Sequence, residues 1–231
     1  MRLFIFNGLE ERDKADAVEK LITQSTPSQD FFLMMALSVL TAVFGVLLGN
    51  VAIVIGSMLI APLLSPILSL SLGITIADSK LIRRSIQTIV KSLTVGVGVS
   101  AVATLIFGAG KIPENLVVSS NPSLLYVAVS VVAGFAATFA LIKPKLNETL
   151  PGVAIAVALI PPIALIGIGL AEMSWTMMTN ALILFGLNIV GIIFAGMVTF
   201  SLMNFHTKKK VIETIVTKED KRLEKEEPKE T

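Results

Sequence analysis

Long apolar stretches alternate with short polar connections along most of this chain. A helix needs about 20 apolar residues to cross roughly 30 Å of hydrocarbon. Stretches of about that length or longer lie at residues 31–49, 51–77, 89–109, 124–142, 149–171 and 177–203. The pattern therefore predicts an all-α integral membrane protein with six transmembrane helices.

Two of the apolar stretches carry a pair of prolines near their centre. The second contains LIAPLLSP at residues 59–66, and the fifth contains VALIPP at residues 157–162. A proline inside a helix has no N–H to donate, and its ring collides with the carbonyl four residues earlier. We expect both helices to be broken there, with released carbonyls on Met58, Pro62, Val157 and Ala158.

The order of the stretches repeats. A shift of 100 residues places Pro62 on Pro162, and each half reads as an uninterrupted span, a broken span and an uninterrupted span. Three crossings per half make the second half enter from the opposite side, which predicts two inverted three-helix repeats. The expected organisation is a short leader of strand and helix (1–30), a first repeat (31–110), a second repeat (124–203) and a charged tail (204–231).

Composition agrees with a membrane protein, because 54% of the residues are hydrophobic, 16% are charged and the mean hydropathy is +0.82. If the N-terminus is inside, 18 of the 19 Lys and Arg residues face the cytoplasm and only Lys111 faces outward. This is the bias that the positive-inside rule describes. We expect a multi-pass protein of the cell membrane with both termini in the cytoplasm.

Three polar segments are expected on the cytoplasmic side. The leader has a β-prone run at residues 2–6, followed by a helical pattern with Ala15, Val18, Leu21 and Ile22 on one side. The connection 78–91, with Asp78 as its N-cap, is expected to lie along the inner membrane surface. The tail is expected to be solvated and partly disordered, with a short helix through Val211, Ile212 and Ile215.

Charged residues are absent from the central part of every predicted span. A proton relay or an ion-pair clamp within the bilayer is therefore not expected. The chain has no cysteine and a single histidine, His206, outside the last span. We predict no enzymatic activity, no catalytic residues, no metal site, no cofactor and no nucleic-acid partner.

The remaining candidate site is made of backbone and small polar groups at the two breaks. Released carbonyls favour cations or hydrogen-bond donors, whereas helix N-termini favour anions, and the sequence leaves this choice open. Ordinary proline kinks and an interhelical hydrogen bond of Asn188 are the simpler interpretation. The predicted substrate-binding residues are Ser57, Met58, Pro62, Ser65, Pro66, Val157, Ala158, Pro161, Pro162 and Asn188.

Three runs, FGVLLGN (44–50), VIGSMLIAPLLSPIL (54–68) and PGVAIAVALIPP (151–162), resemble the DUF389 family of prokaryotic membrane proteins. The resemblance covers about residues 30–205. It implies a multi-spanning hydrophobic domain, and it implies no activity.

Two functions are compatible with this pattern. The first is a transporter or channel-like protein for a small solute or ion, with a midplane site between antiparallel broken helices. The alternative is a non-transporting scaffold or sensor whose basic cytoplasmic face binds lipid or a protein partner. Membrane lipids are expected partners in both cases, and the abundant small residues favour a homo-oligomer.

Overall fold

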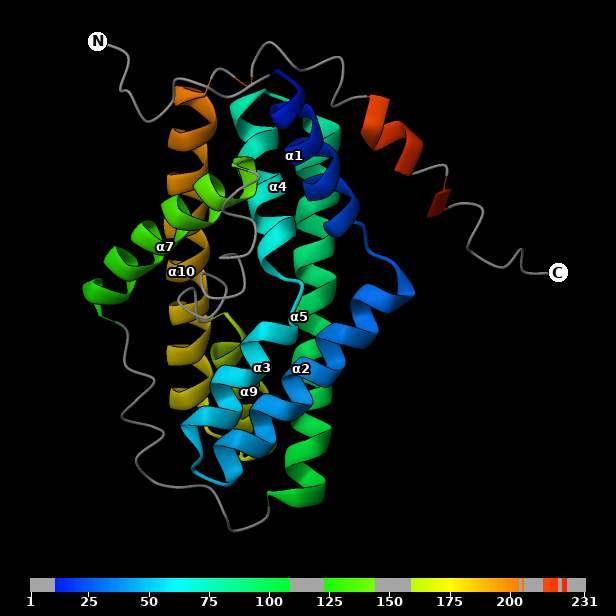
Figure 1. Cartoon of the computed structure of the whole chain (residues 1–231). Coiled ribbons are helices and arrows are strands. Elements are labelled where there is room, and N and C mark those ends of the chain that lie inside the picture. The colour runs from blue at the N-terminus through cyan, green and yellow to red at the C-terminus, as the bar shows by residue number, and fades with distance from the viewer. Residues whose placement is uncertain are drawn as a thin grey trace, which may run out of the picture.

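The computed structural model describes residues 11–108, 123–143, 159–203, 205, 214–219 and 222–223. These residues are helical apart from short connections, which confirms the predicted all-α class (Figure 1). The longer helices are α1 (Glu11–Gln24), α2 (Gln29–Leu47), α3 (Val51–Ile60), α4 (Leu64–Thr75), α5 (Ser79–Phe107), α7 (Leu124–Ile142), α9 (Ile160–Ala171) and α10 (Trp175–Leu202).

Several of these helices could cross a membrane. Helices α2, α5, α7 and α10 are each long and apolar enough, and α3 with α4 forms a further span if the bent pair is counted as one. Helix α9 is apolar but has only 12 residues. The chain is therefore a multi-pass protein with four or five candidate spans among the described residues, and the first part of the predicted fifth span, residues 149–158, lies outside them.

Two long helices frame the centre of the molecule. Helices α4 and α9 lie between α5 and α10, and each contacts both of them. In Figure 1, α4 occupies the upper half of this central layer and α9 the lower half. Since α4 leads upward into α5 and α9 leads downward into α10, the two short helices begin near the middle and run in opposite directions.

The connection 78–91 is not a separate surface segment, and that prediction was wrong. From Ser79 onward it forms the start of the 29-residue helix α5. Asp78 is the N-cap, as predicted, and accepts hydrogen bonds from the N–H groups of Lys80 and Leu81 at 2.9 and 3.0 Å. No glycine or proline occurs between Ser79 and Val95, so nothing in the sequence ends the helix at the membrane surface.

The turn from α4 to α5 is a tight Schellman motif. Ala77 has a φ of 53°, and the N–H of Asp78 donates to the carbonyl of Gly73 at 2.9 Å. A Cβ atom at Gly73 would lie 3.1 Å from the backbone nitrogen of Ile82, so glycine allows α5 to pass close to the end of α4.

The turns from α2 to α3 and from α9 to α10 have the same form. Their residues with positive φ are Gly49 (62°) and Met173 (55°). The next residue in each turn, Asn50 or Ser174, donates its N–H to a glycine carbonyl 2.8 Å away. The same turn geometry thus joins the two helices of three pairs: α2 and α3, α4 and α5, and α9 and α10.

The leader and the tail both pack on the helical bundle. The predicted apolar side of α1 is confirmed for Val18, Leu21 and Ile22, which are buried against the core, and α1 contacts α4. Residues 214–219 form a short helix, which confirms the predicted helix at Ile215. Its Val216 is buried, so this part of the tail is not solvated as predicted. The predicted strand at 2–6 and residues Val211 and Ile212 lie outside the described residues.

Candidate functional site

The break between α3 and α4 bends the chain by 52°. Helix α3 ends at Ile60, Ala61 is extended, and Pro62 lies in the connection that leads to Leu64. Pro66 falls in the first turn of α4, where backbone N–H groups have no partner within the helix. Pro62 is therefore the proline at the interruption, and Pro66 begins the next helix without losing a hydrogen bond.

The break exposes two opposite helix ends. Helix α3 presents its last carbonyls, and one of them, the Ser57 carbonyl, accepts a hydrogen bond from Ser38 Oγ of α2 at 2.7 Å. Helix α4 presents its first N–H groups, and its N-cap residue Leu63 has no side-chain cap. The end of α3 therefore carries a partial negative charge and the start of α4 a partial positive charge.

A cavity of about 560 Å³ adjoins this break. Ala61, Pro62, Leu64 and Ser65 line it at the break itself. One wall is polar and comes from the end of α1, the following linker and the start of α2: Lys20, Thr23, Gln24, Thr26, Ser28 and Asp30. The other walls are apolar and come from α2, α3, α4 and α7: Phe31, Met34, Leu59, Ile60, Leu68 and Leu141.

Hydrogen bonds hold the polar wall against the bundle. Ser65 Oγ donates to Gln24 Oε1 at 3.2 Å, and Ser69 Oγ donates to Ser25 Oγ at 2.9 Å. These contacts place the linker between α1 and α2 over the start of α4.

Arg84 of α5 joins the linker to the tail. Its Nη2 donates to the hydroxyl of Thr26, and its Nη1 donates to the carbonyl of Val216 at 3.4 Å. Thr26 in turn donates to the carbonyl of Ile22 at 2.9 Å, so the end of α1 is tied into the same group of contacts. We call Arg84, Thr26 and Val216 the Arg84 clasp.

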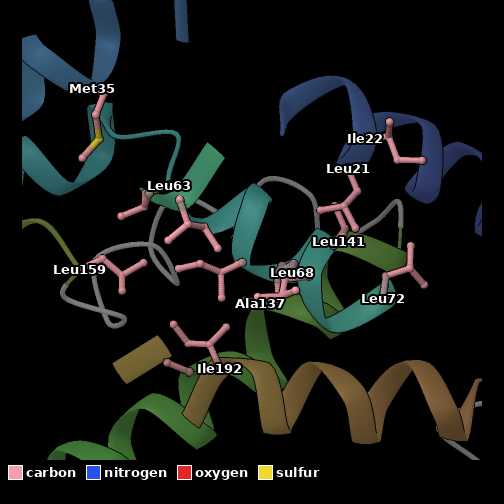
Figure 2. Close-up of a cluster of buried hydrophobic side chains, with 14 of the residues drawn as sticks. Leu21, Ile22, Met35, Leu63, Leu68, Leu72, Ala137, Leu141, Leu159 and Ile192 are labelled. Atoms are coloured by element: carbon pink, nitrogen blue, oxygen red, sulfur yellow. The ribbon is translucent and has the colours of Figure 1, made fainter. Parts of the chain in front are cut away.

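The second pair of prolines begins a helix. Pro161 and Pro162 lie in the first turn of α9, whose N-cap Leu159 also lacks a side-chain cap. Figure 2 shows Leu159 and Leu63 in one cluster of buried side chains, so the starts of α4 and α9 share the same part of the core. Val157 and Ala158 lie outside the described residues.

The other predicted site residues lie away from the cavity. Ser57 is fully buried on α3, and its Oγ donates to the carbonyl of Val54 at 2.6 Å. Met58 packs against the core, and Asn188 is buried on α10. Among the described residues, the cavity brings together Pro62 and Ser65 from the predicted set.

Sequence reasoning missed the polar wall. The buried side of α1 was the available signal, because an apolar helix face requires a partner. The polar run QSTPSQD at residues 24–30 follows that helix directly, so docking α1 on α4 carries this run to the break.

Comparisons with known proteins locate the breaks within a recognised domain. The sequence profile described as "Domain of unknown function (DUF389)" matches residues 58–194. The chain is 33% identical over 208 residues to uncharacterized protein MJ0678 of Methanocaldococcus jannaschii, in an alignment covering 84% of this chain and 63% of that protein. The chain thus matches less than two thirds of this relative's length. No solved structure matches it.

Proposed function

The chain belongs to the DUF389 family, and from this premise we propose that it is a transporter or channel-like membrane protein. It would move a small solute or ion past the break between α3 and α4. The cavity at this break carries the proposal. Non-helical backbone at membrane depth is tolerated where it is buried in protein or lines a water-filled space, and here it borders a space large enough for a solute.

An inverted repeat would give such a site two access routes. The lengths and spacing of the helices support such a repeat. Helices α4 and α9 both have 12 residues, whereas α5 and α10 have 29 and 28. The members of each pair start 96 residues apart, at 64 and 160 and at 79 and 175. By this spacing Pro162 corresponds to Pro66, whereas the sequence shift of 100 paired it with Pro62.

Contacts between the proposed halves add independent support. A Cβ atom at Gly167 of α9 would lie 2.4 Å from Ser100 Cβ of α5, and one at Gly196 of α10 would lie 2.7 Å from Ser71 Cβ of α4. The spacing of 96 converts residue 71 to 167 and residue 100 to 196. A two-fold axis that exchanges the halves would convert one contact into the other, as expected for an inverted repeat.

The test measures uptake of cations, anions and small metabolites into proteoliposomes that contain the full chain. Replacing Ala61, which lines the cavity, by Phe should abolish flux because the larger ring fills the space at the break. The matched control is Ala52→Phe, an exposed position on the same helix pair. Absence of flux for every solute, from protein with an unchanged thermal unfolding midpoint, would contradict the proposal.

The prolines provide a second comparison. Pro62→Ala changes the interruption itself and should alter flux while leaving the fold largely intact. Pro162→Ala changes the first turn of α9 and should also alter flux if both helix starts belong to one site.

The Arg84 clasp favours the alternative function, a scaffold or sensor. Arg84 joins three segments at the basic end of α5, as a device that transmits binding of a lipid or protein would require. Under this alternative Ala61→Phe would leave all activity of the protein unchanged.

A further inference from the structure

We propose that the cavity at the first break binds a zwitterion, a molecule with an ammonium group and an acidic oxyanion next to an apolar group. The inference rests on the proposed function in one respect, since it takes the same cavity as the site. It concerns binding and is tested without measuring transport.

The first argument is the pair of opposite charges in the polar wall. Lys20 lies on the last turns of α1, and Asp30 lies in the first turn of α2. Within the part of the chain that the structure describes, neither side chain forms an ion pair or a hydrogen bond. Ser28, not Asp30, caps α2 by accepting from the N–H of Phe31 at 3.2 Å. Both side chains are therefore available to a ligand that enters the cavity.

The second argument is the pair of helix ends at the break. Gln24, one turn after Lys20 on α1, accepts a hydrogen bond from Ser65 in the first turn of α4, so the α1 end of the polar wall lies beside the positive start of α4. Helix α3 packs antiparallel along α2, and its negative end faces the N-terminal half of α2, which carries Asp30. Within the polar wall, the α1 end with Lys20 thus suits an oxyanion, and the α2 end with Asp30 suits an ammonium.

A ligand with a single charge fits this arrangement poorly. A simple anion would leave Asp30 and the carbonyls of α3 unmatched, and a simple cation would leave Lys20 unmatched. Asp30 is exposed and Lys20 is partly buried, so a ligand with one charge is attracted to one of these side chains and repelled by the other. A zwitterion pairs with both sides at once.

The apolar walls define the rest of the ligand. Phe31, Met34, Leu68 and Leu141 line the cavity outside the polar wall. Two sources carry this chemistry: a free amino acid with an apolar side chain, and the headgroup region of an ethanolamine phospholipid. Leu59 is 50% exposed and also lines the cavity, so an acyl chain could enter from the lipid side.

The experiment is calorimetric titration of the full chain in detergent with two zwitterions, L-leucine and the water-soluble dihexanoyl phosphatidylethanolamine. Isocaproate and isoamylamine, which lack the amine and the carboxylate of leucine respectively, are the single-charge comparisons. We expect one or both zwitterions to bind about tenfold more tightly than either single-charge compound, a difference of about 1.4 kcal/mol. Binding of leucine alone identifies a free solute as the source, and binding of the phospholipid alone identifies the membrane.

Two substitutions test the roles of the charges. Lys20→Gln should remove the advantage of the zwitterion over the amine, and Asp30→Asn should remove its advantage over the acid. The matched controls are Lys91→Gln and Asp16→Asn, which replace exposed residues outside the cavity lining. They should leave the affinities for the zwitterions and for the single-charge compounds unchanged. Variants are compared only where the thermal unfolding midpoint is unchanged.

The inference is overturned if neither zwitterion binds, or if both cavity variants behave like their controls. Flux of an unrelated solute that Ala61→Phe abolishes would then still support the proposed function. Conversely, zwitterion binding without flux would support the inference and contradict transport.

Discussion

Gly167 determines how closely α9 approaches α5. A Cβ atom at this position would lie 2.4 Å from Ser100 Cβ and 2.7 Å from the carbonyl oxygen of Val97. The second neighbour is backbone and cannot rotate away. At the same contact Ser100 Oγ donates to the carbonyl of Ala164 at 2.6 Å, so any separation of the helices also weakens this hydrogen bond.

We predict that Gly167→Ala lowers the free energy of unfolding by about 1–3 kcal/mol, the usual cost of forcing extra volume into a packed interior. The control is Gly98→Ala on α5, where no atom lies within 4 Å of the added Cβ. That change should alter stability by less than about 1 kcal/mol, in the stabilising direction, because alanine favours helix. Unfolding in mixed detergent measures both, and equal losses would contradict the packing argument.

The sequence predicted which residues lie at the breaks, but it did not predict which prolines interrupt a helix and which begin one. The prolines indicated two interruptions, and Pro62 does lie at one. Pro66, Pro161 and Pro162 lie in first turns, because a proline fits the start of a helix as readily as it ends one. Lys20 and Asp30 were assigned only to the polar leader, since nothing local in the sequence brings them to a break 30 residues or more away.

At the scale of elements, the three Schellman turns set the angles between successive helices. Each places one residue in the left-handed region, but only the first uses glycine there, at Gly49. Ala77 occupies the corresponding position between α4 and α5, where an L-residue is strained by roughly 1–2 kcal/mol.

We therefore predict opposite effects of exchanging glycine and alanine in these turns. Ala77→Gly should raise the free energy of unfolding by about 1 kcal/mol, because the strain at positive φ is relieved. Gly49→Ala should lower it by a similar amount. Thermal unfolding of the two variants beside the parent protein checks this, and a loss of stability in Ala77→Gly would show that the turn is not strained.

The apolar pattern predicted most helices within a few residues, and the span 124–142 coincides with α7. It failed where a helix continues past the apolar stretch. Residues 79–91 are rich in charge, yet Leu81, Ser85 and Thr88 form a buried side that continues the packing face of α5. Hydropathy detects lipid-facing surface, whereas these turns are held by contacts with other parts of the protein.

At the scale of the whole molecule, the orientation in the membrane follows from the distribution of positive charge. The α4–α5 turn precedes Lys80, Arg83 and Arg84, whereas the α9–α10 turn is followed by Trp175 and has no Lys or Arg nearby. From the positive-inside rule we predict that the first turn faces the cytoplasm and the second faces outward.

Single cysteines test this orientation cleanly because the chain contains none of its own. A membrane-impermeant maleimide added to intact cells should label Met173→Cys, whose parent side chain is 86% exposed, and should not label Lys80→Cys. Lys80→Cys should react only after the membrane is opened. Labelling of both from outside, or the reverse order, would contradict the predicted topology.

The all-helical, multi-pass class was predictable because lipid requires long apolar helices. The docking of α1 and of the tail was not, since it depends on contacts such as Ser25 with Ser69, 44 residues apart. The polar wall of the cavity forms through that docking. The sequence therefore predicted the lining residues at the break, Pro62 and Ser65, but not the residues of the polar wall.

The Arg84 clasp has a consequence for biosynthesis. Arg84 bonds to Val216, a residue that the ribosome adds 132 positions later. At about 5–20 residues per second, this delay is on the order of ten seconds. Throughout that interval, Arg84 and Thr26 have been made while the tail contact has not. The contacts of Arg84 are therefore complete only after α10 has been synthesised, whereas every residue that lines the cavity precedes α10 in the chain.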